Sequence, residues 1–167
     1  ALPQAGPDAK IALVEMIASR MADEHTGLLL NETASNNAAV KLAAATALAS
    51  VAKQNDIDKI AQLLNTAGNA PLEKAYQTAL YKALAKNPSK AEQLATTQKL
   101  MQGSGNNQQL YYNVLSDIGG KEALAVVLED FKNGTAVQKD AAIKAIASWN
   151  DDTALDVLYQ IAKTGTS

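Results

Sequence analysis

Apolar residues recur along most of the chain at spacings of three and four positions, which is the periodicity of an amphipathic α-helix. The pattern is clear at Ala44, Ala47, Leu48 and Val51, and again at Ile57, Ile60, Leu63 and Leu64. It returns near the C-terminus at Leu124, Val127, Leu128 and Phe131. A further helix is predicted over about residues 8–22, and residues 23–31 either continue or restart it. The pattern therefore predicts an all-α protein.

The helical pattern itself repeats. Residues 44–51 align without gaps with residues 142–149 at an offset of 98 positions, and two further copies fit between them. Each copy has one apolar anchor, and the four anchors are Leu48, Leu80, Leu115 and Ile146. Short polar turns divide each copy into a first helix and a second helix, and the second helix carries the anchor. Self-similarity at 31 to 35 residues predicts an array of helix pairs.

Glycines mark the same place in successive repeats. Gly68, Gly103 and Gly134 each lie 12 residues before an anchor, and Asn36 takes this place before the first anchor. Gly165 follows the last of these glycines by 31 positions. Because glycine, and after it asparagine, tolerates positive φ, we expect a left-handed turn that ends the first helix at each of these positions.

These landmarks predict a single domain over residues 1–167. Residues 1–7 are expected to be a linker or the trimmed end of a longer chain, and residues 8–35 to form N-terminal capping helices. Residues 36–167 are expected to hold the repeats. The helix at 8–22 either caps the array or packs on a domain that precedes it.

The second helix of the last repeat, Val137–Trp149, resembles the valine–basic–alanine helix of HEAT-like repeats. The tetratricopeptide pattern instead needs Trp, Leu-Gly and Tyr at fixed places, and the chain lacks that series. The resemblance implies a right-handed α-α superhelix, a HEAT- or armadillo-like solenoid of about four helical-hairpin repeats plus an N-terminal helix. The arginine that usually follows the valine is replaced by Gln138 and Lys139, so the usual Asp–Arg pairing between repeats lacks its arginine.

The stretch Asp140–Ala162 is also similar to repeats that precede a sugar-acting, jelly-roll-like domain in large bacterial proteins. Those proteins are secreted or envelope enzymes linked to 3-keto-disaccharide hydrolysis. The resemblance covers one repeat closely and the rest of the array loosely. It implies an extracytoplasmic location, periplasmic or secreted, in a bacterium. The catalytic domain is not in the sequence, so no activity is carried over.

Composition narrows the classes of partner and chemistry. The net charge is −2 and Arg20 is the only arginine, so a basic nucleic-acid-binding surface is not predicted. The sequence contains no cysteine, which excludes disulfides, thiolate nucleophiles and cysteine-based zinc sites. No apolar run approaches the roughly 18 residues that span a bilayer, so membrane insertion is not predicted.

No group of residues predicts catalysis, a cofactor or a metal ion. His25 is the only histidine, and the positions four residues away are Met21 and Leu29, which are not the metal ligands that a helical site requires. The glycine-rich stretch 103–107 lacks the Lys-Ser/Thr of a P-loop and is predicted to join repeats. The acidic pairs at 129–130 and 151–152 are predicted to be solvated residues or N-caps. No enzyme and no small-molecule ligand are predicted.

The second helices of HEAT-like repeats line the concave surface of the solenoid, where partners bind. We expect positions three before each anchor (Ala45, Gln77, Tyr112, Ile143) and one after it (Ala49, Tyr81, Ser116, Ala147) to point partly away from the core. The candidate partner-binding residues lie at or beside these positions: Gln77, Tyr81, Lys82, Tyr112, Asn113, Asp117 and Lys144. In the alternative interpretation, Tyr81 and Tyr112 pack between adjacent repeats. Core positions are predicted for Tyr76, Tyr111 and Trp149.

The sequence thus predicts a non-enzymatic interaction or scaffold module, which binds a protein partner or positions a neighbouring domain through the second-helix surface. One alternative is an accessory repeat region of a carbohydrate-active, glycoside hydrolase-like secreted bacterial protein, and it depends on the resemblance alone. Another is an enzyme built on the repeat, as in HEAT-like bilin lyases or DNA-base glycosylases. The acidic balance argues against the DNA enzyme, and His25 is the remaining support for either.

Overall fold

Every regular element in the described part of the chain is helical, which confirms the all-α prediction. The computed structural model describes residues 5–164. The chain divides into two compact units, an N-terminal unit (Ala1–Pro88) and a C-terminal unit (Ser89–Ser167). None of the helices in residues 5–164 is both long and apolar enough to cross a membrane. The single repeat domain over 1–167, with its linker and cap, stays a prediction.

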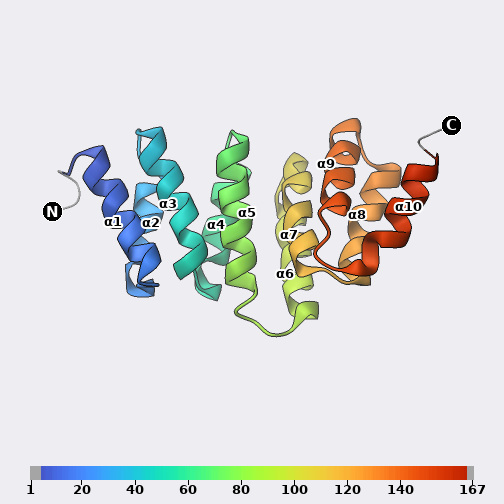
Figure 1. Cartoon of the computed structure of the whole chain (residues 1–167), viewed down its shortest axis with the longest axis horizontal. Helices are drawn as coiled ribbons and strands as arrows, with labels where there is room; N and C mark the ends of the chain where they lie inside the picture. Colours follow the sequence, from blue (N-terminus) through green and yellow to red (C-terminus); the bar gives the residue numbers. More distant parts are fainter. Residues whose placement is uncertain (1–4, 165–167) are drawn as a thin grey trace. The chain divides into compact units, whose positions relative to one another are not determined.

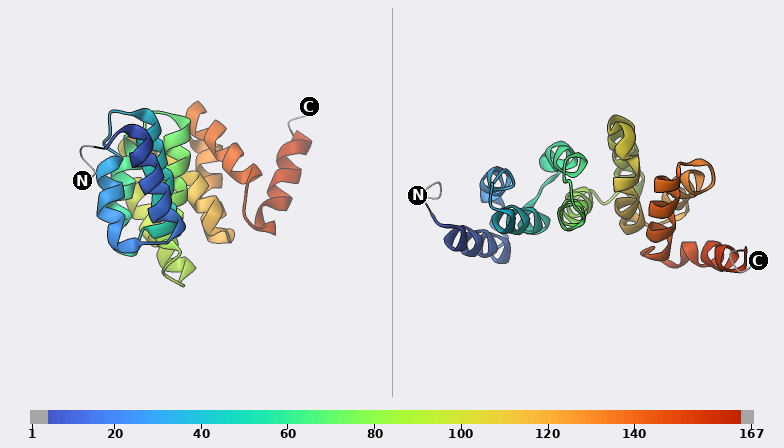
Figure 2. Two further views of the ribbon diagram at one scale, coloured as in Figure 1. Left: turned by 60° about the vertical axis from the view of Figure 1, so that its left-hand side comes forward. Right: turned by 90° about the horizontal axis from the view of Figure 1, so that it is seen from above.

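The N-terminal unit contains two rows of helices. In order, its elements are α1 (Pro7–Ser19), η2 (Asp23–His25), α2 (Thr26–Glu32), α3 (Ala38–Val51), η3 (Gln54–Asp56), α4 (Ile57–Asn65) and α5 (Ala70–Leu84). Helix α3 packs against α1, α2 and α5, and α5 packs against α4. Helices α1, α3 and α5 therefore form one row, and α2 and α4 form the other (Figures 1 and 2). The predicted N-terminal helices at 8–35 correspond to α1, η2 and α2.

The C-terminal unit continues the alternation with a shorter central helix. Its elements are α6 (Lys90–Gly103), η4 (Gly105–Tyr111), α7 (Tyr112–Ile118), α8 (Lys121–Asn133), α9 (Ala136–Ala147), η5 (Asp152–Ala154) and α10 (Leu155–Thr164). Helix α7 packs against α6, α8 and α9, and α8 packs against α9. The second helices of this unit are therefore α7, with the η4 turns before it, and α9.

The anchors form the centre of each core. All four have no exposed surface, and they lie at Leu48, Leu80, Leu115 and Ile146. Tyr76 and Tyr111 are also buried, at 2% and 0% exposed, which confirms their predicted core positions. Trp149 is only half-buried, although its indole Nε1 is buried and has no hydrogen-bond acceptor among residues 5–164.

The predicted left-handed turns are wrong at three of the four positions in the described chain. Gly68 has positive φ (73°), but Gly103 and Asn36 do not, and Gly134 is extended with φ −73° and ψ 174°. Glycine is required at position 134 for a different reason, because a Cβ atom there would collide with the backbone carbonyl of Asp130. Gly165 lies outside the described residues.

The recurring landmark is instead the residue after each of these positions, which begins the second helix. Asn37 Oδ1 accepts from the backbone N–H groups of Ala39 and Val40 at 3.0 and 3.1 Å, and Asn69 Oδ1 accepts from Leu72 at 3.1 Å. Further along the chain, Thr135 forms a capping box with Gln138. These side chains satisfy backbone donors that a helix start leaves free. Ser104 has the same place before η4, but its hydroxyl donates to the Met101 carbonyl.

The expected exposure of the positions three before each anchor is wrong for Ala45, Gln77 and Tyr112, which are 0%, 8% and 1% exposed. A second helix contacts more than one neighbour, as α3 does with α1, α2 and α5. A position three residues before the anchor lies only about 60° from it around the helix, so it falls within the same covered side. Ile143, in the last repeat, is half-buried.

Candidate functional site

On each second helix, the residues two before and two after the anchor lie on the exposed side. Two residues correspond to about 200° of helix rotation, so these side chains point away from a buried anchor. The residues two before the anchors are all exposed, and they are Thr46, Thr78, Asn113 and Lys144. The residues two after are exposed, or half-buried at 117, and they are Ser50, Lys82, Asp117 and Ser148. These eight residues are called the second-helix face below.

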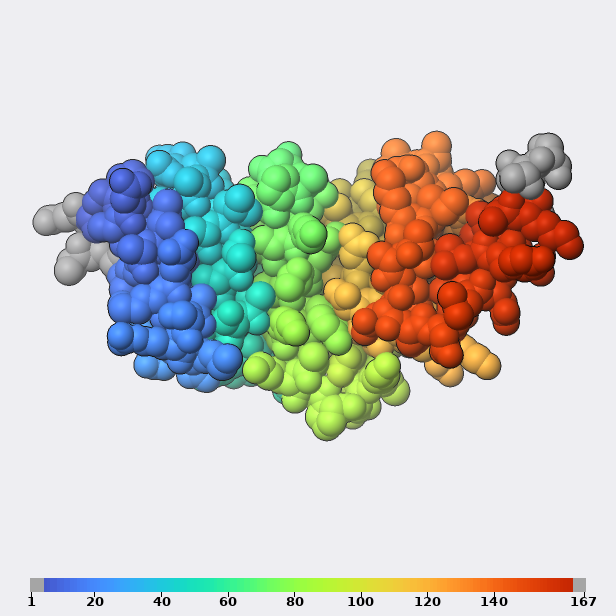
Figure 3. Space-filling model, in the orientation of Figure 1, coloured from blue at the N-terminus to red at the C-terminus, as the bar shows by residue number. Residues whose placement is uncertain are grey.

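In the N-terminal unit the second-helix face is built on α3 and α5, which pack side by side. Figure 3 shows α1, α3 and α5 as adjacent ridges on the side of this unit that faces the viewer. The Thr46 hydroxyl donates to the Leu42 carbonyl, and the Thr78 hydroxyl donates to the Lys74 carbonyl, both at 2.9 Å. Because these hydroxyl protons are used within their own helices, the threonines offer a partner oxygen acceptors and methyl groups.

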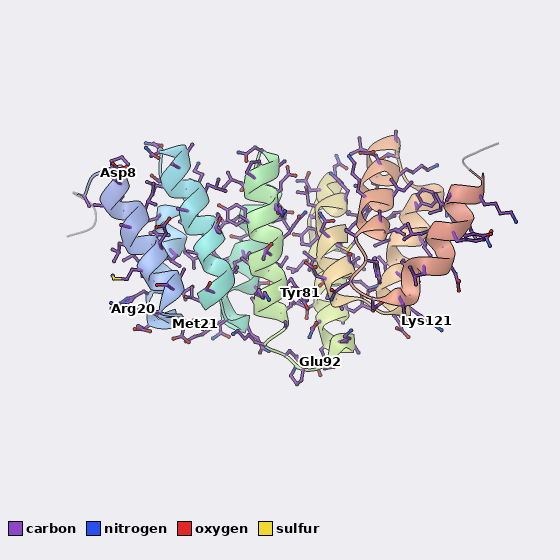
Figure 4. All side chains as sticks on the ribbon, viewed as in Figure 1. Asp8, Arg20, Met21, Tyr81, Glu92 and Lys121 are labelled. Carbon is purple, nitrogen blue, oxygen red and sulfur yellow. The ribbon has the colours of Figure 1, made fainter. Side chains whose placement is uncertain are left out.

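Lys82 adds a positive charge to this part of the face. Its Nζ lies 5.9 Å from the centroid of the Tyr81 ring, within the range of a cation–π interaction. Tyr81 is half-buried on α5, where Figure 4 labels it. These two predicted residues are neighbours in the sequence, and the structure places the ammonium group of one near the ring of the other.

In the C-terminal unit the second-helix face is carried by α7 and α9, which pack against each other. Lys144 Nζ pairs with Asp140 Oδ2 at 2.7 Å, one helical turn away, and both side chains are largely exposed. Exposed pairs of this kind stabilise a helix by only about 0.3–0.5 kcal/mol, so a partner carboxylate can compete for the ammonium group. The backbone carbonyl of Asp117 accepts from Asn150 Nδ2 at 3.1 Å, which fixes the C-terminal end of α7.

Two predicted residues, Gln77 and Tyr112, are too buried to present a surface. The Tyr112 hydroxyl donates to Asp130 Oδ2 at 2.7 Å and joins α7 to α8. Burial raises the pKa of Tyr112 well above its usual value, and the hydrogen bond and negative charge of Asp130 raise that pKa further. The phenol is therefore held neutral, and its role in this unit is structural.

The predicted residues are divided between the units. Gln77, Tyr81 and Lys82 lie in the N-terminal unit, whereas Tyr112, Asn113, Asp117 and Lys144 lie in the C-terminal unit. The sequence reasoning missed four small polar members of the second-helix face: Thr46, Thr78, Ser50 and Ser148. Counting 100° per residue from the anchor would have found all four, since positions two away fall opposite the core.

The histidine and the aspartate pair that the sequence offers for catalysis or metal binding contact neighbouring residues of their own helix ends. His25 is exposed, and its Nε2 lies 3.8 Å from Glu24 Oε1. Asp151 accepts from the backbone N–H of Thr153 at 3.0 Å and from its hydroxyl, which confirms the predicted N-cap. A third donor, the backbone N–H of Gly120, lies 2.8 Å from Asp151. These bonds from Thr153 and Gly120, together with the charge of Lys90, lower the pKa of the Asp151 carboxyl.

Both residues of the acidic pair at 129–130 accept hydrogen bonds from side chains of the C-terminal unit. Glu129 Oε1 accepts from Asn133 Nδ2 at 2.7 Å, and Asp130 accepts from the tyrosine of α7. Within residues 5–164, no group of three or more histidine, aspartate or glutamate side chains is arranged to hold a metal ion. The exposed side chains of the second helices are therefore the candidate functional surface.

Comparison of the chain with family models, with curated proteins and with solved structures gave no match.

Proposed function

We propose that the chain is a non-enzymatic interaction module, which binds a protein partner or positions a neighbouring domain through the second-helix face. The observation that supports the proposal is the repetition of the same exposed register. Each of the four second helices presents the residues two before and two after its anchor. A surface built once per repeat gives each unit two neighbouring second helices that a partner can meet together.

The side chains of this face suit a folded protein surface. The N-terminal unit contributes hydroxyl groups and a lysine, and the C-terminal unit contributes an amide, a carboxylate and a second lysine. In the N-terminal unit, the charged Lys82 lies beside the half-buried Tyr81 ring, and aromatic side chains with polar neighbours are typical of protein interfaces. The net charge of −2 does not favour the phosphate backbone of a nucleic acid.

The architecture belonging to this proposal is a right-handed HEAT-like superhelix. Its support is the 31- to 35-residue repeat and, in the N-terminal unit, the packing of α1, α3 and α5 in one row. An extracytoplasmic location and an association with a carbohydrate-active domain are supported by the sequence resemblance of Asp140–Ala162.

Site-specific photo-crosslinking in the native host tests the proposal. A photoreactive phenylalanine analogue replaces Thr46, Thr78, Asn113 or Lys144, one at a time. Matched controls place the same analogue at Gln62 on α4 or Lys99 on α6, which are exposed positions on first helices. We expect the same discrete crosslinked protein from several second-helix positions and from neither control.

The pattern of products decides the result. Crosslinks of equal yield from the second-helix positions and from the controls would show that the second-helix face has no special role. A partner captured by the controls alone would place the binding surface on the first helices and overturn the proposal.

A further inference from the structure

One second helix of the N-terminal unit carries a row of lysines. Lys74, Lys82 and Lys86 are exposed, and with the exposed Thr78 they lie at intervals of four residues. Each step of four residues rises about 6 Å and rotates by about 40°, so the four side chains form one ridge along α5 and the turn after it. The Lys86 N–H donates to the Ala83 carbonyl at 3.3 Å, which keeps the chain in a helical turn there. These four residues are called the lysine ridge below.

The lysine ridge differs from the equivalent rows of the other second helices. Each row takes the positions six before, two before, two after and six after an anchor. The row of α3 is uncharged, and the rows of α7 and α9 contain acidic residues. In chain order these rows are Leu42, Thr46, Ser50 and Gln54; Gln109, Asn113, Asp117 and Lys121; and Asp140, Lys144, Ser148 and Asp152. Positive charge without a carboxylate is therefore particular to α5.

The charges of the ridge are not compensated within the described residues. Neither Lys74, Lys82 nor Lys86 forms an ion pair in residues 5–164. Helix α3 contains no acidic residue, and the one on α5, Glu73, is half-buried and lies only about 20° around the helix from the anchor. Lys82 and Lys86 are one turn apart, and like charges at this spacing repel each other. An anionic partner would offset that repulsion.

An open hollow of about 430 Å³ lies at the end of the ridge that contains Lys86, within the N-terminal unit. Its lining includes hydroxyl, amide and ammonium groups that donate hydrogen bonds: Ser50, Lys53, Gln54, Asn55 and Lys86. The one carboxylate in the lining, Asp23, pairs with Lys53 at 3.0 Å. Two ammonium groups therefore face one carboxylate, and the remaining donors suit the oxygens of a second carboxylate.

The surface beside the ridge also provides an aromatic contact. The half-buried Tyr81 ring lies next to Lys82, with 5.9 Å between the ring centroid and the ammonium nitrogen. On α3, which packs against α5, the exposed side chains of the second-helix face are the short Thr46 and Ser50. A partner backbone can approach short side chains closely, so the tyrosine and the lysines both lie within its reach.

We propose that the partner segment on the N-terminal unit is an acidic stretch of protein, with its carboxylates on the lysine ridge and one of them in the hollow beside Lys86. This inference rests on the proposed function and names the chemistry of the partner at one part of the second-helix face. Complementary charges speed the encounter and fix the register, while the aromatic contact adds affinity. A partner helix of about 12 residues, about 18 Å long, spans the ridge from Lys74 to Lys86.

Two other anionic ligands match the ridge less well. Proteins that bind DNA through its backbone make on the order of six to ten phosphate contacts, whereas the ridge has three ammonium groups. Anionic lipid surfaces are recognised by clusters of about four to eight basic residues, which again exceeds the ridge. A short acidic stretch of protein is the ligand whose size and charge agree with three lysines on one helix.

An NMR titration of the isotope-labelled full chain tests the inference with defined probes. The first probe is an alanine-based helical peptide of about 16 residues with glutamate at every fourth position, and its control has glutamine at those positions. We expect backbone shifts in α3, α5 and the hollow, with a Kd of about 1 mM or tighter for the glutamate peptide alone. Salt at about 1 M should abolish these shifts, since it screens exposed charges.

Charge variants locate the binding on the ridge. The triple variant Lys74→Gln, Lys82→Gln and Lys86→Gln should bind the glutamate peptide at least about tenfold more weakly. The matched triple variant loses the same charge at exposed lysines of first helices and should bind as the wild type does; it is Lys59→Gln, Lys99→Gln and Lys132→Gln. The reversal Lys74→Glu, Lys82→Glu and Lys86→Glu should instead bind a peptide with lysine in place of glutamate. Far-UV circular dichroism verifies that each variant is folded.

Crosslinking from Thr46 in the native host separates this inference from the proposed function. The yield of the partner should fall at least about tenfold in the Lys→Gln ridge variant and stay unchanged in the matched variant. An unchanged yield in the ridge variant would overturn the acidic partner and leave the proposed function standing. No crosslinked partner from any second-helix position of the wild type would overturn both.

Other results with the probes would also overturn the inference. They are no binding of the glutamate peptide at about 1 mM, equal binding of the glutamine peptide, and equal weakening in the two triple variants, which would show a response to net charge alone. Tighter binding of single-stranded DNA or of phosphatidylserine vesicles than of the glutamate peptide would identify a different class of ligand and would equally exclude the acidic partner.

Discussion

The two units have the same alternation of first and second helices, but different contacts hold the second helices in place. In the N-terminal unit the second helices are long, with 14 residues in α3 and 15 in α5, and they meet through alanine- and leucine-rich surfaces. In the C-terminal unit α7 has only seven residues. Hydrogen bonds add to its apolar contacts, from Tyr112 to Asp130 and from Ser116 to the Ser148 carbonyl at 3.0 Å. A short helix buries less apolar surface, so directional polar bonds have a larger share in holding it.

The largest expected effect comes from emptying a core. Leu48→Ala in the N-terminal unit and Ile146→Ala in the C-terminal unit should each lower the free energy of unfolding by about 2–5 kcal/mol, since both anchors have no exposed surface. Hydrogen exchange should show the loss of protection concentrated in the unit that carries the substitution. Equal loss in both units for either variant would mean that they unfold as one, and the comparison between them would fail.

A smaller effect, specific to the C-terminal unit, is expected at Gly119. This residue has φ 72°, and a Cβ atom there would collide with the Asp151 carboxylate, which caps η5 and accepts from Gly120. Gly119→Ala should cost about 3 kcal/mol in a denaturant titration, through the backbone conformation and the displaced carboxylate.

The matched control for this glycine is Gly27→Ala in α2, where an added Cβ would meet no atom within 4 Å. Alanine has a higher helix propensity than glycine, so the control should be neutral or stabilising by up to about 1 kcal/mol. A destabilisation of the same size in both variants would show that the α7–α8 turn has no special requirement for glycine.

The hydrogen bond between α7 and α8 should contribute least of the three. Tyr112→Phe leaves the Asp130 carboxylate without this donor and should cost about 2 kcal/mol at neutral pH. Because the folded state raises the pKa of Tyr112, its contribution is fully present below about pH 10, where tyrosine ionises in the unfolded chain, and is lost as the pH rises further.

Chemical denaturation at pH 7 and above pH 10 measures this contribution, with Tyr159→Phe, at an exposed tyrosine, as the control. The stability difference between wild type and Tyr112→Phe should narrow at high pH, whereas the control should track the wild type throughout. A constant difference across the pH range would exclude ionisation of this phenol as the cause.

Much of the fold could be predicted because apolar periodicity is a direct consequence of helix burial. The anchors at Leu48 and Ile146 are buried as the pattern requires. The left-handed turns could not be predicted in the same way, because a glycine or asparagine between two helices fits both the end of the first helix and the start of the second. The Asn37 side chain accepts from backbone donors of the second helix, so the asparagine there caps the start of that helix.

The candidate site was predicted less well, since exposure depends on every neighbour of a helix. Gln77 and Tyr112 lie only about 60° around the helix from their anchors, and the structure buries both. Lys82, Asn113 and Lys144 are exposed, as expected of surface residues. The positive φ of Met21 has no signal in composition or periodicity, because methionine gives no indication of a left-handed backbone.

The caps described above also define which part of the repeat has a fixed length. The capping residues at 37, 69 and 135, and Ser104 in the same place without a capping bond, all lie 11 residues before their anchors. The anchors themselves are 32, 35 and 31 residues apart. All variation in repeat length therefore falls between an anchor and the next cap, in the turn and first helix. Residues inserted there would lengthen a loop or a first helix, whereas one residue inserted between Asn69 and Leu80 would rotate the second helix by about 100° and turn its anchor away from the core.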